Sequence, residues 1–274
     1  MIRRLVPGDK VAVAQLCGRV SSDDFVPLYF DSIINQKVGF GLEENGVLVG
    51  IVFSSVTLDG EAWLFGLRVD PGHQRKGIGR CLTEQALKEI PRSCRLVRLG
   101  IFTDNRASMQ LARSFGFSER AQYFFREFRG AAPRVSAVKL EHVGPERLEE
   151  ILARLTSDRR LQANNLLLPH FYEWFRIARG SLSTLIENGW VWSAGGQLAV
   201  VSTEQVDSEV EIGYLSEPCN QVLPAILDRF STDVIEASLP SGPALENTLQ
   251  QFGFVVPSWG SRMTIYERLL PSDY

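Results

Sequence analysis

The sequence has few of the residues that build metal centres or disulfide frameworks. Its 274 residues include four cysteines and three histidines. The cysteines (Cys17, Cys81, Cys94 and Cys219) lie far apart and form no Cys-x-x-Cys pair. Zinc sites and redox pairs need closely spaced ligands. We therefore expect no metal, and four reduced, buried thiols typical of a cytoplasmic protein.

Long apolar runs and an excess of one charge are also missing. No stretch approaches the roughly 18 uninterrupted apolar residues of a membrane span. Arg3 and Arg4 are not followed by the apolar core of a signal peptide. The net charge of −3 gives no electrostatic reason to bind nucleic acid. We expect a cytoplasmic protein that binds neither nucleic acid nor membrane, with enough chain for two domains.

A short basic segment lies between an expected strand and an expected helix. The apolar run 63–69 predicts a strand, and Pro71 ends it. Apolar residues at helical spacing begin at Ile78. Between them, residues 74–80 read Gln-Arg-Lys-Gly-Ile-Gly-Arg. The segment therefore forms a loop that enters a helix.

The composition of this loop suits an anion. Gly77 and Gly79 carry no Cβ, so a ligand can approach the backbone closely. The first N–H groups of the helix have no intrahelical partner, and the helix dipole adds positive charge there. Arg75, Lys76 and Arg80 add full charges. We interpret the loop as a pyrophosphate cradle, with an ordinary basic turn as the alternative.

The loop lacks the Lys-Ser or Lys-Thr pair of a P-loop, which argues against nucleotide binding, and it is not Gly-x-Gly-x-x-Gly. Instead, Leu-Arg-Val-Asp-Pro is followed by Gln-x-x-Gly-x-Gly. This order resembles the coenzyme A loop of the GNAT superfamily of N-acetyltransferases. The resemblance covers most of residues 1–128.

A second block resembles the same family. Residues 97–117 run from a short strand through Asp104-Asn105, a helix cap, into a helix over 106–114 that stops near Gly116. The resemblance implies that Asn105 contacts the pantetheine arm. It also implies that the strand ending Leu67-Arg68-Val69 separates from its neighbour, so that its N–H groups bind the thioester and pantetheine. The expected coenzyme residues are Leu67, Val69, Gln74, Arg75, Lys76, Gly77, Ile78, Gly79, Arg80, Asn105 and Ser108.

The catalytic residues typical of the family are only partly present in this sequence. An alkyl ammonium acceptor of pKa ~10.4 must first lose a proton, which costs ~4.6 kcal/mol at pH 7. Glu61 is the nearest carboxylate with the right alternation, and it is our candidate general base; a solvated turn residue is the alternative. The family's thiolate-protonating tyrosine falls at Ala112, so Tyr123, another residue or solvent must serve. We expect His73 to face phosphate or solvent.

The order of expected strands and helices begins again after a candidate linker at 129–134. Residues 138–140 predict a strand and 146–155 an amphipathic helix. Residues 97–117 and 234–254 align without a gap, and both end Phe-Gly-Phe. The repeat predicts a second, divergent copy, with unrelated strand–helix units as the alternative.

We therefore expect an α/β (α+β) protein of two GNAT-like domains, each a mixed, largely antiparallel sheet flanked by helices. Residues 1–130 form the acetyl-CoA-binding domain. Residues 135–274 form the divergent one, since Ser216–Asn220 has no glycine and no basic residue. The second domain packs on the first, shapes the acceptor cleft or makes an oligomer contact, and a homodimer stays open. The second domain is expected to cover the unpaired edge of the first sheet, and a strand from the C-terminal region is one way to do so.

The aromatic residues of the second half are expected mostly in its core. They are Phe171, Tyr172, Trp174, Phe175, Trp190, Trp192 and Trp259.

The resemblance implies an N-acetyltransferase. It would transfer an acetyl group from acetyl-CoA to a primary amine of a small molecule, or to an exposed peptide amine. A non-catalytic acyl-CoA-binding sensor or interaction module is the alternative. The sequence does not identify the acceptor.

Overall fold

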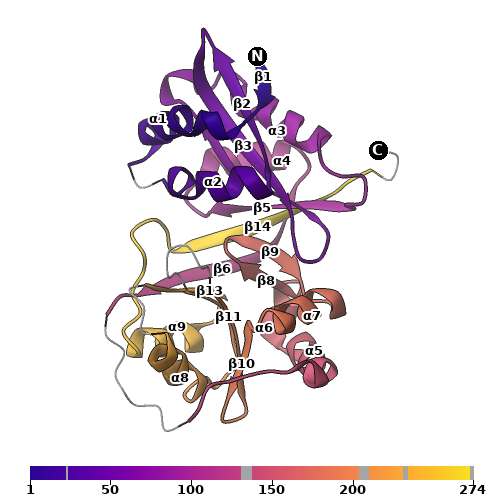
Figure 1. Ribbon diagram of the computed structural model, residues 1–274, viewed down its shortest axis with the longest axis vertical. Helices are drawn as coiled ribbons and strands as arrows, with labels where there is room; N and C mark the ends of the chain where they lie inside the picture. Colours follow the sequence, from indigo (N-terminus) through magenta and orange to yellow (C-terminus); the bar gives the residue numbers. More distant parts are fainter. Residues whose placement is uncertain (23, 131–137, 204–209, 231–233, 272–274) are drawn as a thin grey trace. The chain divides into compact units, whose positions relative to one another are not determined.

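The computed structural model describes residues 1–22, 24–130, 138–203, 210–230 and 234–271. The chain divides into two compact units (Figure 1). Unit 1 comprises Met1–Gly100, Arg106–Ser118 and Glu267–Tyr274, and unit 2 comprises Ile101–Asn105 and Glu119–Tyr266. The functional domains 1–130 and 135–274 stay a prediction. Residues 131–134 of the candidate linker lie outside the described residues.

The first half of the chain alternates strands and helices as expected. Its elements are β1 Ile2–Arg4, α1 Lys10–Val20, α2 Val26–Gln36, β2 Val38–Glu44, β3 Val47–Val56, β4 Ala62–Val69, α3 Ile78–Lys88, β5 Leu96–Phe102, α4 Arg106–Ser114 and β6 Ser118–Phe128.

The second half repeats this succession with an insertion. Its elements are β7 Glu141–His142, α5 Leu148–Ser157, α6 Arg159–Ala163, β8 Leu167–His170, β9 Glu173–Arg176, α7 Arg179–Glu187, β10 Val191–Ala194, β11 Gln197–Thr203, β12 Val210–Leu215, α8 Val222–Arg229, β13 Ile235–Pro240, α9 Pro243–Gln251 and β14 Arg262–Leu269.

Unit 1 contains a mixed sheet with the order β1-β2-β3-β4-β5-β14. The strands β1 to β4 pair antiparallel, and β4 pairs parallel with β5. Val13, Leu16, Phe30 and Phe53 form a buried cluster that holds α1 and α2 against the sheet. The turn between β2 and β3 has positive φ at both Asn45 and Gly46, as in a type I′ hairpin, so the predicted hairpin is confirmed.

Unit 2 contains the mixed strand order β6-β13-β12-β11-β10-β7. Its strands pair antiparallel apart from β12 and β13, which run parallel. The expected fold class is therefore confirmed for both units. The predicted strand at 138–140 is wrong, because the short strand β7 begins at Glu141 and pairs with β10.

The register of the strands supports the predicted internal repeat. Helices α4 and α9 have equal length and the same offset as the aligned blocks, and Gly116 and Gly253 both have positive φ after them. Strand β4 pairs with β5 at Trp63–Arg98, and β12 pairs with β13 at Val210–Ile235. The second half therefore repeats the strand–helix order of the first.

An inserted hairpin, β8–β9, distinguishes unit 2. Its turn residues Phe171 and Tyr172 both have positive φ and are partly buried. Trp174 and Phe175 are fully buried, as the core prediction required, and Trp174 packs edge-on against Tyr123.

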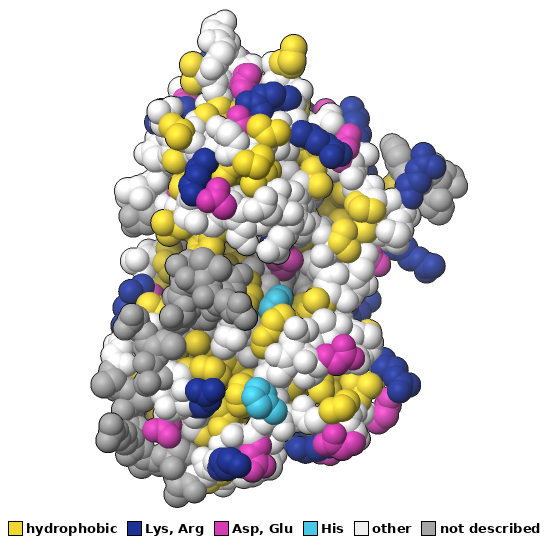
Figure 2. Space-filling model, in the orientation of Figure 1, with side chains coloured by type: hydrophobic (Ala, Val, Ile, Leu, Met, Phe, Trp, Pro, Cys, Tyr) yellow, Lys and Arg dark blue, Asp and Glu magenta, His cyan; other side chains and the backbone are white. Residues whose placement is uncertain are grey.

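The expectation that all four cysteine thiols are buried is confirmed only in part. All four are free, but Cys81 is exposed on α3, so the expectation of four buried thiols is wrong there. Among the described residues, no helix is long and apolar enough to cross a membrane. On the face shown in Figure 2, basic and acidic side chains are intermixed, as the small net charge suggests.

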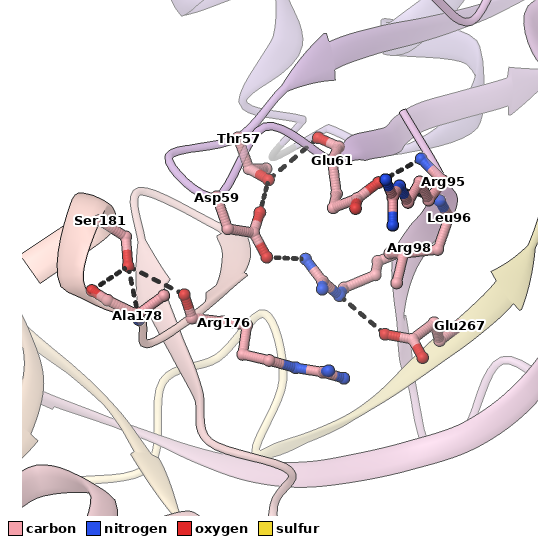
Figure 3. Close-up of polar contacts among 10 residues, drawn as sticks. All are labelled: Thr57, Asp59, Glu61, Arg95, Leu96, Arg98, Arg176, Ala178, Ser181 and Glu267. Atoms are coloured by element: carbon pink, nitrogen blue, oxygen red, sulfur yellow. Dashed lines mark hydrogen bonds and ion pairs between the residues drawn. The ribbon is translucent and has the colours of Figure 1, made fainter. Parts of the chain in front are cut away.

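A C-terminal strand lies at the edge of β5, as predicted. Strand β14 is the neighbour of β5, and Glu267–Tyr274 belongs to unit 1. The Arg98 side chain of β5 is only 1% exposed and donates to Asp59 at 2.8 Å and to Glu267 at 3.0 Å (Figure 3). A buried arginine between two buried carboxylates therefore joins the C-terminus to the body of unit 1.

We expect Arg98→Met to lower the free energy of unfolding by about 3–5 kcal/mol, because it leaves Asp59 and Glu267 buried without the guanidinium. Urea unfolding of the full chain measures this. Arg147→Met is the matched control, since Arg147 and Glu150 form a surface pair worth about 0–1 kcal/mol. Equal losses in the two variants would contradict this role of Arg98.

Candidate functional site

The strands β4 and β5 separate where the predicted site begins. They pair at Ala62–Val97, Trp63–Arg98 and Leu64–Leu99. Within the described residues 62–102, their pairing stops there, while β4 continues to Val69. The separation expected from the resemblance is therefore present, and the edge of β4 beyond Leu64 is turned away from β5.

A bulge in β4 accompanies this separation. The residues Phe65 and Arg68 oppose Phe53 and Ile51, so β4 has one more residue than β3 in this interval. Gly66 lies in the bulge with φ +65°. A bulge increases local twist and redirects the strand. Our sequence analysis missed Gly66, although an isolated glycine in a strand pattern is a signal for a bulge.

Asp70 organises the turn that follows β4. Its carboxylate accepts a hydrogen bond from the Gly72 N–H at 2.9 Å and lies 3.1 Å from His73 Nδ1. The Arg19 Nε of α1 donates to it at 2.5 Å. These contacts, with His73 first and Arg19 second, lower the pKa of Asp70 to about 2. His73 is therefore held by Asp70, with its Nε2 3.6 Å from Glu44.

The loop itself wraps around the start of α3. The side chains of Gln74, Arg75 and Lys76 are exposed, and Arg75 has φ +60°. Gly77 is the N-cap of α3 with φ +83°, and a Cβ placed there would meet nothing within 4 Å. Ile78 is buried, which anchors the first turn of the helix.

The open space beside Gly77 has the properties that a diphosphate requires. The N–H groups at the start of α3 have no intrahelical partner, and the dipole is positive at this end. Exposed cations at Arg75 and Lys76 flank the opening. The residues present therefore fit the pyrophosphate group of coenzyme A.

The other predicted coenzyme residues fall into three places. Leu67 and Val69 lie in the separated end of β4, and both are within 4 Å of a Cβ built on Gly79. Arg80 turns toward α4, where it donates to Ser114 Oγ at 2.9 Å and stacks on Phe115.

Ser108 lies in α4 of unit 1. Asn105 closes the segment Ile101–Asn105, which belongs to unit 2, and its N–H donates to Phe102 O. Unit 1 thus brings together all of the predicted coenzyme residues except Asn105.

The candidate base Glu61 lies at the other end of β4. Its Oε2 accepts hydrogen bonds from the backbone N–H groups of Arg95 at 2.7 Å and Leu96 at 2.9 Å (Figure 3). The eight residues of β4 separate it from the loop, and at ~3.3 Å per residue this is about 25 Å. Through these two hydrogen bonds, Glu61 holds the start of β5 in place.

The position of the family's tyrosine and the alternative acid Tyr123 are both buried. Ala112, at the tyrosine position, lies in the buried face of α4. Tyr123 is fully buried and donates its hydroxyl to Leu167 O at 2.5 Å. Burial raises the pKa of Tyr123 well above its ordinary value. A tyrosine in this position is part of the core of unit 2.

Arg68 is a second residue that the sequence analysis missed. It lies in β4 between Leu67 and Val69, and its guanidinium donates to both carboxylate oxygens of Asp24, at 2.5 and 3.0 Å. The Asp24 side chain is only 3% exposed. This bidentate pair ties the connection between α1 and α2 to the separated end of β4.

The corresponding region of unit 2 has no such loop. Gly213 lies in the bulge of β12, and a Cβ there would be 2.8 Å from Pro169 O of the inserted hairpin. The segment before α8 contains Glu217, which pairs with Arg160 at 3.2 Å. Among the described residues, no group of three or more His, Cys, Asp or Glu is placed to hold a metal ion.

Comparisons with known proteins agree with this geometry. Residues 15–117 match the acetyltransferase (GNAT) family. The chain is 37% identical over 85 residues to the [ribosomal protein bS18]-alanine N-acetyltransferase of Escherichia coli K12, which is 31% of this chain. It spans 57% of the length of that curated relative.

Solved structures of similar fold extend over both units. A GCN5-related N-acetyltransferase from Sphaerobacter thermophilus covers 98% of this chain and 95% of its own, with TM-score 0.64 and 12% identity. A tandem GNAT protein from the clavulanic acid biosynthesis pathway covers 100% and 99%, with TM-score 0.58 and 14% identity. Residues 15–117 therefore match the GNAT acetyltransferase family, and the fold of the chain is similar to that of a tandem GNAT protein.

Proposed function

We propose that this chain is an N-acetyltransferase that transfers an acetyl group from acetyl-CoA to a primary amine of a small molecule or to an exposed peptide amine. The observation that carries the proposal is the loop 74–80. It places the open, left-handed Gly77 at the N-terminus of α3, next to the separated end of β4. We further propose that the enzyme acts in the cytoplasm.

Backbone groups would hold the coenzyme. The N–H groups from Lys76 to Arg80 would bind the pyrophosphate, with the cations of the loop around them. Leu67 and Val69 would direct N–H groups at the thioester oxygen and the pantetheine amides. Asn105 and Ser108 would contact the pantetheine arm. Bound acetyl-CoA supplies the activated acetyl group, and holding both reactants in place lowers the entropic barrier.

The hydrogen bonds of Asp70 order the loop before the coenzyme binds. Asp70 fixes Gly72 and His73 from one side and is itself held by Arg19 of α1. The Gln74 side chain contacts Val69 O at 3.4 Å, which joins the loop to the end of β4. A loop that is already ordered loses less entropy when the anion binds.

The acceptor amine would enter beside Arg68 and Asp24, whose pair fixes the connection of α1 and α2 at the end of β4. Peptide α-amines are one acceptor class to test, because the name of the curated relative specifies an alanine of a ribosomal protein. We assign no general acid, since the family's tyrosine position is the buried Ala112.

A non-catalytic acyl-CoA sensor is the second candidate. The buried Ala112 and the backbone bonds of Glu61 favour it. Thiol release from acetyl-CoA, measured with a thiol-reactive dye across a panel of small amines and a peptide with N-terminal alanine, separates the two. Amine-dependent release supports the transferase. Saturable coenzyme binding without release by any amine supports the sensor.

We expect Gly77→Val to weaken coenzyme A binding by about 100-fold, because the side chain fills the phosphate position and the loop loses charged hydrogen bonds worth about 3 kcal/mol. Calorimetry of the full chain measures this. Gly46→Val is the matched control, since Gly46 also has positive φ and open space but lies in the β2–β3 turn. Equal affinity in both variants would contradict the proposed site.

The low pKa of Asp70 predicts a pH dependence of stability. Its pKa falls from an ordinary 3.8 to about 2, so its ionised contacts stabilise the fold above pH 3.8 and are lost as pH falls toward 2. We expect the difference in free energy of unfolding between the natural protein and Asp70→Asn to shrink over this interval. Urea titrations at several pH values measure it. Asp31→Asn is the surface control, because its exposed ion pair with Lys10 contributes only about 0–1 kcal/mol.

We expect Glu61→Gln to lower the free energy of unfolding by about 1 kcal/mol, because the backbone N–H groups of Arg95 and Leu96 lose their charged acceptor. We expect Glu61 to act through the backbone of β5 and not as the general base, so kcat/KM should stay within about threefold. Loss of a general base would lower it by about 100-fold or more. Glu149→Gln is the surface control for stability. A large fall in kcat with unchanged stability would identify Glu61 as the base.

A further inference from the structure

A groove in unit 1 lies at the opposite end of α3 from the loop 74–80. Its volume is about 820 Å³. The walls are the C-terminal half of α3, the connection to β5, Phe115 after α4, and the end of β14 with the residues that follow it. The 11 residues of α3 place it about 16 Å from Gly77 along the helix axis. The groove therefore lies beyond the loop 74–80, and two of its lining residues, Glu84 and Phe115, lie against Arg80.

The rim of the groove is strongly basic. Its charged residues are Lys88, Arg92, Arg95 and Arg268, with Glu84 as the single carboxylate. Glu84 also faces Arg80 at 3.9 Å. Within the described part of the chain, no ion pair involves any of these four cations. Among the described lining residues, four cations thus face one carboxylate, although the whole chain has a net charge of −3.

The wall of the groove is apolar. Leu87 of α3, Ile90 in the connection after α3, and Phe115 are partly buried and line it. Leu269 lines it as well and is 70% exposed, and among the described large apolar side chains only Met1 and Leu28 are more exposed. Burying such a leucine removes apolar surface from water, so a partner that covers it gains binding free energy.

We propose that this groove binds an acidic, amphipathic peptide segment of a partner protein. Arginine forks pair with carboxylates in bidentate geometry, and three of the four rim cations are arginines. The apolar wall requires apolar side chains between the carboxylates of that segment. One face of a short helix, with Glu or Asp beside Leu or Phe, meets both conditions.

Two other ligands fit the groove less well. Coenzyme A needs free N–H groups, whereas this end of α3 presents carbonyl oxygens and the negative end of the dipole. A nucleic acid gains little from exposed leucines, since its backbone is recognised by charge and its bases by aromatic stacking. Nucleic acid is therefore one of the alternative outcomes of the test.

The test measures fluorescence polarisation of labelled probes with the full chain at physiological ionic strength. The probe is a fluorescein-labelled peptide of Glu-Glu-Leu-Leu repeats. Comparison probes are a peptide of Lys-Lys-Leu-Leu repeats, poly-glutamate and an oligo-uridylate RNA. We expect saturable binding of the first probe only.

The variant Lys88→Glu with Arg92→Glu reverses two exposed charges of the rim. We expect it to weaken binding of the acidic peptide by about tenfold or more. Leu269→Asp should weaken it also, because it removes apolar contact area and adds a repelling charge. The matched control, Lys139→Glu with Arg159→Glu, changes two exposed cations of unit 2 and should leave the affinity unchanged.

Three results would overturn the proposal. They are no saturable binding of the acidic peptide, equal binding of poly-glutamate, and RNA binding that the rim variant abolishes. Coenzyme calorimetry on the same variants should give unchanged affinity, so failure of this proposal is distinguishable from failure of the proposed acetyl transfer.

Discussion

A buried arginine is the constraint on which unit 1 depends. Arg98 is enclosed with Asp59 and Glu267, which lies 169 residues further along the chain. A buried charge is costly unless it is paired and hydrogen-bonded, so this arrangement admits few other geometries. Two residues from Asp59, Glu61 caps the start of β5 through two backbone N–H groups. Together these carboxylates fix β5 against the beginning of β4 and the end of β14 (Figure 3).

Because the starts of β4 and β5 are held together, the later part of β4 diverges from β5 in a defined direction. The strands pair over three residues, and the bulge at Gly66 then directs β4 away. Asp70 holds the following turn, and the buried Ile78 anchors the helix that begins after Gly77. The loop thus gets its shape from contacts on both sides. Its cations are exposed, so they can face an anion. The shape of the loop is held by Asp70 and Ile78.

The second unit shows that the same framework persists without the loop. It keeps the parallel pair β12–β13, the bulge with its glycine and the helix α9 at the equivalent place. It has lost the glycines and cations before α8, and Pro169 of an inserted hairpin lies close against Gly213. The packing of sheet and helices therefore depends on apolar pattern and register, while anion binding depends on a few loop residues that can be lost without loss of fold.

The sequence by itself determined the elements with strong local signals. The Asn45-Gly46 hairpin, the helix α4 and the strand β14 occur where periodicity and turn residues placed them, because these signals act over neighbouring residues. The loop 74–80 was predictable for the same reason. Only the tertiary structure decided that Glu61 caps β5, that Arg68 pairs with Asp24 and that Arg98 joins Asp59 to Glu267. Those partners lie between 34 and 169 residues apart, and no local pattern of charge or polarity specifies which distant group a buried side chain will meet.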